Sequence, residues 1–148
     1  MGDYCLHTDV EAELTELTVA RLTAATGSTP DDTVTDEQID LSETEINGHL
    51  AVRYSVPVDV AVAHLDAADQ LKRLTLALVV YRLYSRKRVQ VPSVTADRAA
   101  AIEELKAIAA GTMELGTAST PDSTTAREPT SSWSSQTAIT GRSNMVGL

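Results

Sequence analysis

The residue types that most often carry chemistry are few in this chain, and their spacing favours no reaction. The three histidines, His7, His49 and His64, stand far apart, and none has a second histidine three or four positions away. Because a helix-borne metal site needs such spacing or a cysteine cluster, we expect surface or partly packed imidazoles and no metal ion. The single cysteine, Cys5, has only His7 nearby to lower its pKa, so we expect neither a catalytic thiolate nor an internal disulfide.

A cluster of acids at Asp31, Asp32, Asp36 and Glu37 has the composition of a calcium loop. An EF-hand loop, however, needs acids at its first, third and fifth positions and a glycine at its sixth, and residues 33–35 break that pattern. We therefore expect a solvated loop followed by the acidic first turn of a helix. The chain also lacks a glycine-rich phosphate loop, a nucleophile elbow and paired catalytic carboxylates, so the sequence predicts no enzyme and no cofactor.

The one basic cluster comprises Arg82, Arg86, Lys87 and Arg88. Two uses are open for it. The cations can contact nucleic acid, or they can terminate a helix and meet acids of residues 1–50, in the same chain or in a neighbouring one. The overall charge favours the second use, because 21 acidic and 12 basic residues give a net charge of −9, whereas a DNA-binding module is basic.

Charge and composition divide the chain into three parts. Residues 1–50 hold 12 acids and one base, residues 51–116 hold seven acids and nine bases, and residues 117–148 hold two of each. The last part contains 14 serines and threonines and too little apolar surface to fold alone. We therefore expect a folded domain over residues 1–116 and an extended arm over residues 117–148.

The arm carries isolated apolar residues that suit docking on a partner, for example by strand addition to the edge of the partner's sheet. These anchors are Trp133, Ile139, Met145, Val146 and Leu148.

Apolar periodicity predicts that residues 1–116 form an all-α, four-helix bundle. The first helix is expected to open with a capping box at Thr8 and to end before Gly27, and the second to span about residues 36–53 after a box at Thr35. Thr95 is expected to cap the fourth helix, which Gly111 ends.

The third helix has the strongest pattern, because Leu71, Leu74, Leu78 and Tyr81 recur at steps of three and four residues. Further apolar residues on its other sides predict a central, buried helix that ends near residues 86–88. Only 3% of the residues are aromatic and phenylalanine is absent, which favours a core of Leu, Val, Ile and Ala. No apolar run is long enough to span a membrane and no secretory leader opens the chain, so we expect no membrane contact.

Several short motifs, in this order and at this spacing, resemble the Mu-like head–tail connector proteins (adaptor, or head-completion, proteins) of tailed phages over about residues 4–116. The motifs are Tyr4-Cys5, residues 46–54 running into 56–58, residues 81–84, and residues 105–111 followed by Leu115-Gly116. Residues 142–148 resemble the terminal segment of that family more loosely. Residues 27–35 differ from the Asp/Gly-rich turn of many relatives, which leaves open any ion-binding role for this loop.

The resemblance implies a virion protein at the head–tail junction, assembled in the host cytoplasm. Such adaptors form a ring, typically of twelve copies, beneath the portal protein, and they close the filled head. They present a surface to the stopper or tail-completion protein, while DNA passes through the lumen without sequence-specific binding. Their C-terminal segments commonly reach the portal, which gives the arm of residues 117–148 a docking role.

Charge asymmetry suggests how such a ring is held together. We infer a heterologous interface between neighbouring subunits. It sets the acidic front of one subunit (residues 1–50) against the basic back of the next (residues 51–116). One alternative function is a stopper or tail-terminator at the next level of the neck, a class that is usually β-rich. Another is a small regulatory binding protein, which would need a basic, groove-reading helix that only residues 82–88 approach.

Overall fold

The computed structural model describes residues 2–24, 28–59 and 65–116, and these residues form helices joined by turns, with no strand among them. The helices are α1 (His7–Leu14), α2 (Glu16–Thr23), α3 (Asp32–Leu50), α4 (Leu65–Arg86) and α5 (Pro92–Ala110). The prediction of an all-α fold is therefore confirmed.

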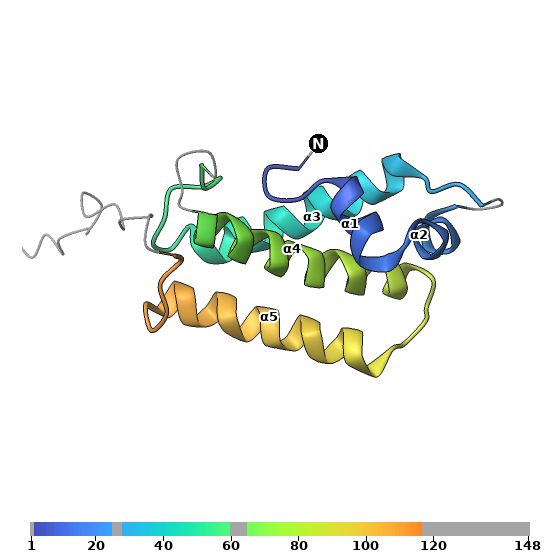
Figure 1. Cartoon of the computed structure of the whole chain (residues 1–148). Coiled ribbons are helices and arrows are strands. Elements are labelled where there is room, and N and C mark those ends of the chain that lie inside the picture. The colour runs from blue at the N-terminus through green and yellow to red at the C-terminus, as the bar shows by residue number, and fades with distance from the viewer. Residues whose placement is uncertain (1, 25–27, 60–64, 117–148) are drawn as a thin grey trace, which may run out of the picture.

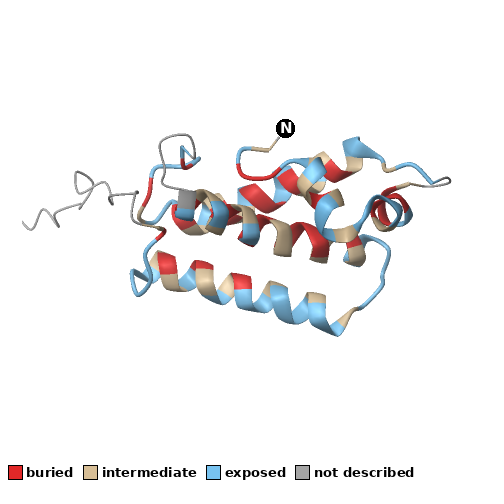
Figure 2. Cartoon of the chain, in the orientation of Figure 1, coloured by how far each residue is buried: buried red, intermediate tan, exposed pale blue. Residues whose placement is uncertain are grey.

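Helix α4 lies at the centre of the bundle and contacts each of the other four helices (Figure 1). As its periodicity predicts, Leu71, Leu74 and Leu78 are fully buried, and Leu83 is buried on a second side of the helix. Helix α5 packs along one side of α4, whereas α1 and α2 lie on the other side of it (Figure 1 and Figure 2). A helix that is apolar on several sides needs neighbours on several sides, which is why α4 occupies the centre.

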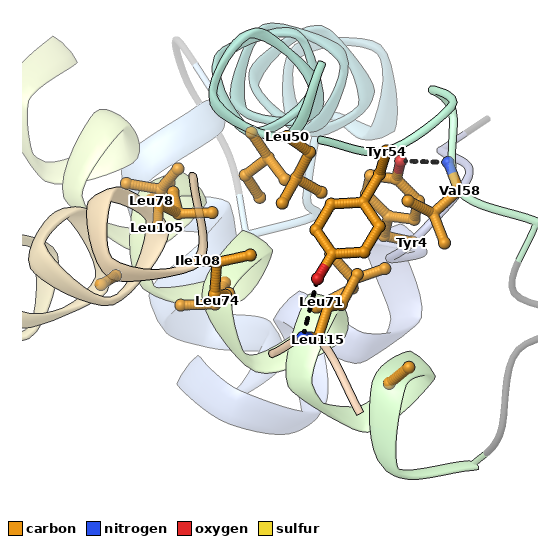
Figure 3. Close-up of a cluster of buried hydrophobic side chains, with 13 residues drawn as sticks. Tyr4, Leu50, Tyr54, Val58, Leu71, Leu74, Leu78, Leu105, Ile108 and Leu115 are labelled. Atoms are coloured by element: carbon orange, nitrogen blue, oxygen red, sulfur yellow. Dashed lines mark hydrogen bonds between the residues drawn. The ribbon is translucent and has the colours of Figure 1, made fainter. Parts of the chain in front are cut away.

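The core consists of two aliphatic clusters. The larger cluster joins α3, α4 and α5 through residues such as Ile46, Leu74 and Leu105, and Figure 3 shows it closed at one end by Tyr4 and Tyr54. The smaller cluster joins α1 and α2 to α4, with Val10 and Leu83 among its members. Leu, Ile, Val and Ala thus make almost the whole interior, as the absence of phenylalanine predicts.

The first predicted helix is in fact two helices, so the expectation of four helices is wrong by one. The chain turns at Thr15, whose φ of 69° ends α1 and starts α2. The Thr15 carbonyl accepts hydrogen bonds from the amides of Thr18 and Val19, both at 3.0 Å, which begins the second helix at once. This turn brings Val19 of α2 into the same cluster as Val10 of α1. Tertiary burial of both helices outweighs the backbone strain of a β-branched residue at positive φ.

Three of the predicted helix starts are also wrong, because each helix begins before the threonine expected to cap it. Helix α1 starts after Leu6, whose amide donates to the Asp9 carboxylate at 3.0 Å, rather than at Thr8. Helix α3 starts after Asp31, whose carboxylate accepts from the Val34 amide at 3.3 Å. The threonine expected to cap it is instead buried inside its first turn.

Helix α5 likewise starts earlier than predicted. Pro92 occupies its first turn, three residues before Thr95, and a proline there needs no amide partner. The predicted ends hold at two helices. Helix α4 ends at Arg86, and α5 ends at Gly111, which takes a φ of 79°.

Candidate assembly surfaces

The predicted basic cluster is divided between three environments. Arg82 donates to the Glu45 carboxylate of α3 at 2.7 Å, and Arg98 of α5 approaches the other oxygen of Glu45 at 3.5 Å. The Arg98 guanidinium also lies 4.6 Å from the centre of the Tyr81 ring, a cation–π distance. Glu45 therefore ties α3 to both α4 and α5 within one subunit.

Arg86 and Lys87 bind a helix end rather than acids. The Arg86 guanidinium donates to the carbonyls of Leu22 and Thr23 at 3.3 and 3.2 Å, and the Lys87 ammonium donates to the Ala24 carbonyl at 3.1 Å. These carbonyls lie at the C-terminal end of α2, where the helix dipole is negative and its last carbonyls lack partners within the helix. The two cations thus fasten α2 to the end of α4.

Arg88 differs from its neighbours in both conformation and surroundings. It takes a φ of 57°, and its amide donates to the Ser85 carbonyl at 2.9 Å. The Val89 amide donates to the Tyr84 carbonyl at 3.0 Å, so the two bonds together form a Schellman motif with arginine where glycine is usual. The Arg88 side chain is exposed, and it makes no hydrogen bond or ion pair with any residue that the structure describes.

A hollow lies beside Arg88 at this end of the bundle. It lies between the end of α4 and the start of α5 and has a volume of about 390 Å³. We call it the turn hollow; it is lined by Tyr81, Tyr84, Ser85, Arg88, Val89, Gln90, Val91, Val94 and Thr95. Val89 is 47% exposed at its edge. Aromatic rings, valines and a free guanidinium make this hollow able to take an apolar side chain flanked by carboxylates.

The acidic front of the chain is used in two ways. Some of its carboxylates work inside the subunit: Asp9 of α1 pairs with Lys72 of α4 at 2.6 Å, just as Glu45 pairs with Arg82. Others stay on the surface of α3 and surround an exposed leucine. We call this surface the α3 acidic face; its residues are Asp32, Asp36, Glu37, Asp40 and Leu41. Its nearest base is His7, whose Nδ1 lies 3.7 Å from the Asp36 carboxylate.

Glu43 is a buried carboxylate with a structural task that sequence reasoning missed. Only 5% of it is exposed, and it accepts hydrogen bonds from the amides of Asp3, Tyr4 and Cys5 at 2.8, 2.8 and 3.2 Å. It thereby holds the N-terminal segment against α3. The sequence feature that indicates this role is the position of Glu43 on the apolar stripe of α3, because a carboxylate there must find buried hydrogen-bond donors.

Two tyrosines fasten the loops at the other end of the bundle (Figure 3). The Tyr4 hydroxyl donates to Asn47 at 2.5 Å and accepts from the Val58 amide at 2.8 Å, which links the N-terminal segment to the turn after α3. The Tyr54 hydroxyl accepts from the Leu115 amide at 3.3 Å. Both ring systems are buried, so these bonds lie inside the larger core cluster.

The chain leaves the folded body at a defined point. Leu115 is fully buried, and Gly116 takes a φ of 49° against the start of α4. A Cβ at Gly116 would lie 2.8 Å from the Cβ of Ala67, so only glycine fits this close approach. The backbone at Gly116 is therefore held against α4.

Cys5 is buried, and burial, with a smaller contribution from the Asp9 charge, raises its pKa to about 12. Among the described residues no three histidine, cysteine or acidic side chains gather in a way that would hold a metal ion. Within the same ranges no helix is long and apolar enough to cross a membrane. His64 and the five arm anchors, Trp133, Ile139, Met145, Val146 and Leu148, lie outside the described residues.

The fold and these surfaces define a small all-helical protein whose buried polar groups fasten its helices and whose exposed face is acidic. The family model of bacteriophage Mu Gp36 matches residues 4–132 of the chain. The chain therefore belongs to this family of Mu-like phage proteins, and it is a phage protein of the structural or morphogenetic kind. The match extends 16 residues beyond Gly116 into the predicted arm. No curated protein matches the chain.

Proposed function

We propose that this protein is a head–tail connector of the adaptor type. It forms a ring beneath the portal, closes the filled head, and joins the head to the neck while leaving a channel for DNA. The observation that carries the proposal is the match to the bacteriophage Mu Gp36 family over residues 4–132. The order of short motifs along the chain, from Tyr4-Cys5 to Leu115-Gly116, supports it.

The contacts of Leu115 and Gly116, the last described residues before the predicted arm, support the proposal further. An arm that docks on a portal has to leave every subunit of a ring at the same place and in the same direction. The Tyr54–Leu115 hydrogen bond and the contact of Gly116 with Ala67 meet that need. Residues 117–148 then supply the anchors from Trp133 to Leu148 for the portal.

The all-helical body favours an adaptor over a stopper or tail-terminator, because those neck proteins are usually β-rich and the described residues contain no strand. A regulatory nucleic-acid-binding role has less support. Three of the four cations of the basic cluster, Arg82, Arg86 and Lys87, bind Glu45 or the end of α2. The cluster is therefore poor in cations free to meet phosphates.

Imaging of virions and of the purified protein with its portal tests the proposal. Mass spectrometry of purified virions should detect the chain, and electron microscopy should show a ring of it on the portal face that points away from the head. Phage that lacks the gene should produce filled heads without tails, and the wild-type gene supplied in trans should restore joining.

Other outcomes point elsewhere. A ring one level further down the neck, bound to an adaptor that is a different protein, would identify a stopper or terminator. Absence from virions, together with a shift of duplex DNA at moderate salt, would identify a regulatory protein. Either result would overturn the adaptor proposal.

A further inference from the structure

A ring of identical subunits needs two different surfaces on each subunit, one that fits the next copy and one that fits the previous copy. The sequence suggests a broad match between the acidic front and the basic back. The structure leaves fewer cations for a contact between subunits, because most cations of the basic back already pair with groups of their own subunit. Lys72 pairs with Asp9, and Arg82 pairs with Glu45, within one chain. Among the lysines and arginines of the described residues, only Arg21 and Arg88 have side chains with neither a hydrogen bond nor an ion pair.

The α3 acidic face offers an exposed leucine among carboxylates, which suits the acidic half of an interface. Leu41 is 45% exposed and is framed by the carboxylates of Glu37 and Asp40 on the same side of α3. No lysine or arginine of the described residues pairs with these two carboxylates. An exposed leucine ringed by unpaired acids is matched by an apolar recess beside a free cation.

The turn hollow has those complementary features. It offers tyrosine and valine side chains around a volume of about 390 Å³, which is roomy enough for a leucine side chain. Arg88 lines it with five guanidinium donors, none of which has a partner among the described residues of its own subunit. The backbone of Arg88 is left-handed, a conformation in which glycine would be less strained.

The two surfaces also lie on different sides of one subunit. Figure 1 shows the start of α3 on the side of α4 that carries α1 and α2, and the α4–α5 turn at the opposite edge of the same end of the bundle. A contact between two unlike surfaces joins copies head to tail rather than by a two-fold axis, and it closes into a ring when the rotation from copy to copy closes.

We propose that the α3 acidic face of one copy docks on the turn hollow of the next copy, with Leu41 entering the hollow and Glu37 and Asp40 facing Arg88. The proposal rests on the adaptor function and names the contact between neighbouring subunits of its ring. The occupant of the hollow is a second copy of this chain.

Cross-linking of two variants, each with one added cysteine, tests the contact without removing the residues that make it. Thr44→Cys lies at the edge of the acidic face, and Gln90→Cys lies beside Arg88; both positions are exposed. Cys5 does not compete, because it is buried and its thiol stays protonated. The full-length variants are mixed, alone at high concentration and with portal-bearing heads, and treated with a short bismaleimide.

We expect a covalent dimer in the mixture and none from either variant alone, because the contact joins unlike surfaces. A mixture of Thr44→Cys with Ala110→Cys, which is exposed at the far end of α5, is the matched control and should remain monomeric. Equal cross-linking in the control mixture, a dimer from one variant alone, or no dimer in either setting overturns the inference.

Substitution of Arg88 separates assembly from folding. Arg88→Gly removes the side chain and relieves the positive φ, so it should raise the midpoint of thermal unfolding while reducing ring formation at least tenfold. Lys106→Glu, an exposed charge reversal in the last turns of α5, should leave ring formation unchanged. If Arg88→Gly forms rings like the wild-type chain, the inference fails although the adaptor function stands. If the wild-type chain neither binds the portal nor occurs in virions, the adaptor function itself fails.

Discussion

Glu43 shows at the residue scale how one buried carboxylate fastens a whole segment. It lies between Ile39 and Ile46 on the stripe of α3 that faces the core, and it accepts three amides of the N-terminal segment. The charge is tolerated because the three donors replace its water. The sequence shows the carboxylate on an apolar stripe, but it does not show which donors lie opposite.

Replacement of Glu43 by alanine should lower the free energy of unfolding by about 3 kcal/mol, because three amides lose their acceptor and at least two of them are buried. Urea unfolding followed by circular dichroism measures the change. Glu43→Gln should cost less, since one amide oxygen can still accept from the Tyr4 and Cys5 amides.

Glu37→Ala is the matched control, because Glu37 is an exposed glutamate of the same helix. It should change the stability by less than about 0.5 kcal/mol. A loss at Glu37 as large as that at Glu43 would show that the effect comes from helix propensity or net charge rather than from the three hydrogen bonds.

Cys5 makes stability fall at high pH. Its ordinary pKa is 9.0, and burial raises the pKa in the folded protein to about 12. Between these values the unfolded chain releases the proton and the folded chain keeps it, so each rise in pH favours unfolding. Burial also raises the pKa of Tyr4 above 10.0, which acts in the same direction. Urea titrations at pH 7, 9 and 10.5 should show constant stability up to about pH 9 and a decline above it.

Cys5→Ser is the control for this titration. Serine does not ionise in the range, so the decline above pH 9 should become shallower, with the contribution of Tyr4 remaining. A profile identical to that of the wild-type protein would contradict the assignment to the thiol.

At the scale of elements, α1 is attached to α4 partly by the Asp9–Lys72 ion pair at 2.6 Å. Burial disfavours the charged form of Asp9, but the Lys72 ammonium and the Leu6 amide outweigh it and lower the pKa of this carboxyl. The hydrogen bond to Asp9 raises the pKa of Lys72 in turn. The pair therefore stabilises the fold above pH 3.8 and loses its effect as the pH falls through the lowered pKa of Asp9.

Lys72→Met should lower the free energy of unfolding at pH 7 by about 0.5–1 kcal/mol, a size typical of partly exposed pairs. The difference from the wild-type protein should vanish at low pH, once Asp9 is protonated in both proteins. Lys106→Met breaks an exposed pair with Glu103 inside α5 and should cost less than about 0.5 kcal/mol at any pH. Thermal unfolding across a pH series distinguishes the two.

A comparison of the predicted and observed helix boundaries shows which of them can be read from the sequence. The end of α5 at Gly111 and the end of α4 at Arg86 were predictable, because a glycine and a run of cations are local stop signals. Helices α1, α3 and α5 begin after Leu6, after Asp31 and at Pro92, whereas the sequence pattern places each start at a threonine further along the chain. Several residues near a helix start can cap it, and tertiary packing selects among them. The turn at Thr15 had no local signal at all.

At the scale of the whole molecule, the division into body and arm remains a prediction. Removal of residues 117–148 should change the free energy of unfolding by less than about 0.5 kcal/mol, since the core lies within residues 4–115, and it should abolish attachment to the portal. Calorimetry and sedimentation with portal-bearing heads measure the two effects.

A second truncation sharpens this test, because the family match ends at residue 132. A chain ending there retains the matched segment but loses all five anchors, so it should fold normally and still fail to attach. A large drop in melting temperature on either truncation would contradict the separation of body from arm.

The sequence by itself determined the fold class, the central position of α4 and the family, because apolar periodicity, composition and short motifs are local properties of the chain. Only the tertiary structure decided how the charges are used. The acidic front and basic back meet inside one subunit, as in the Glu45–Arg82 pair, and leave Arg88 and the α3 acidic face exposed. A charge pattern gives the sign of an attraction but not its partner, because a pairing such as Asp9 with Lys72 joins residues that are distant in the chain and depends on how the helices pack.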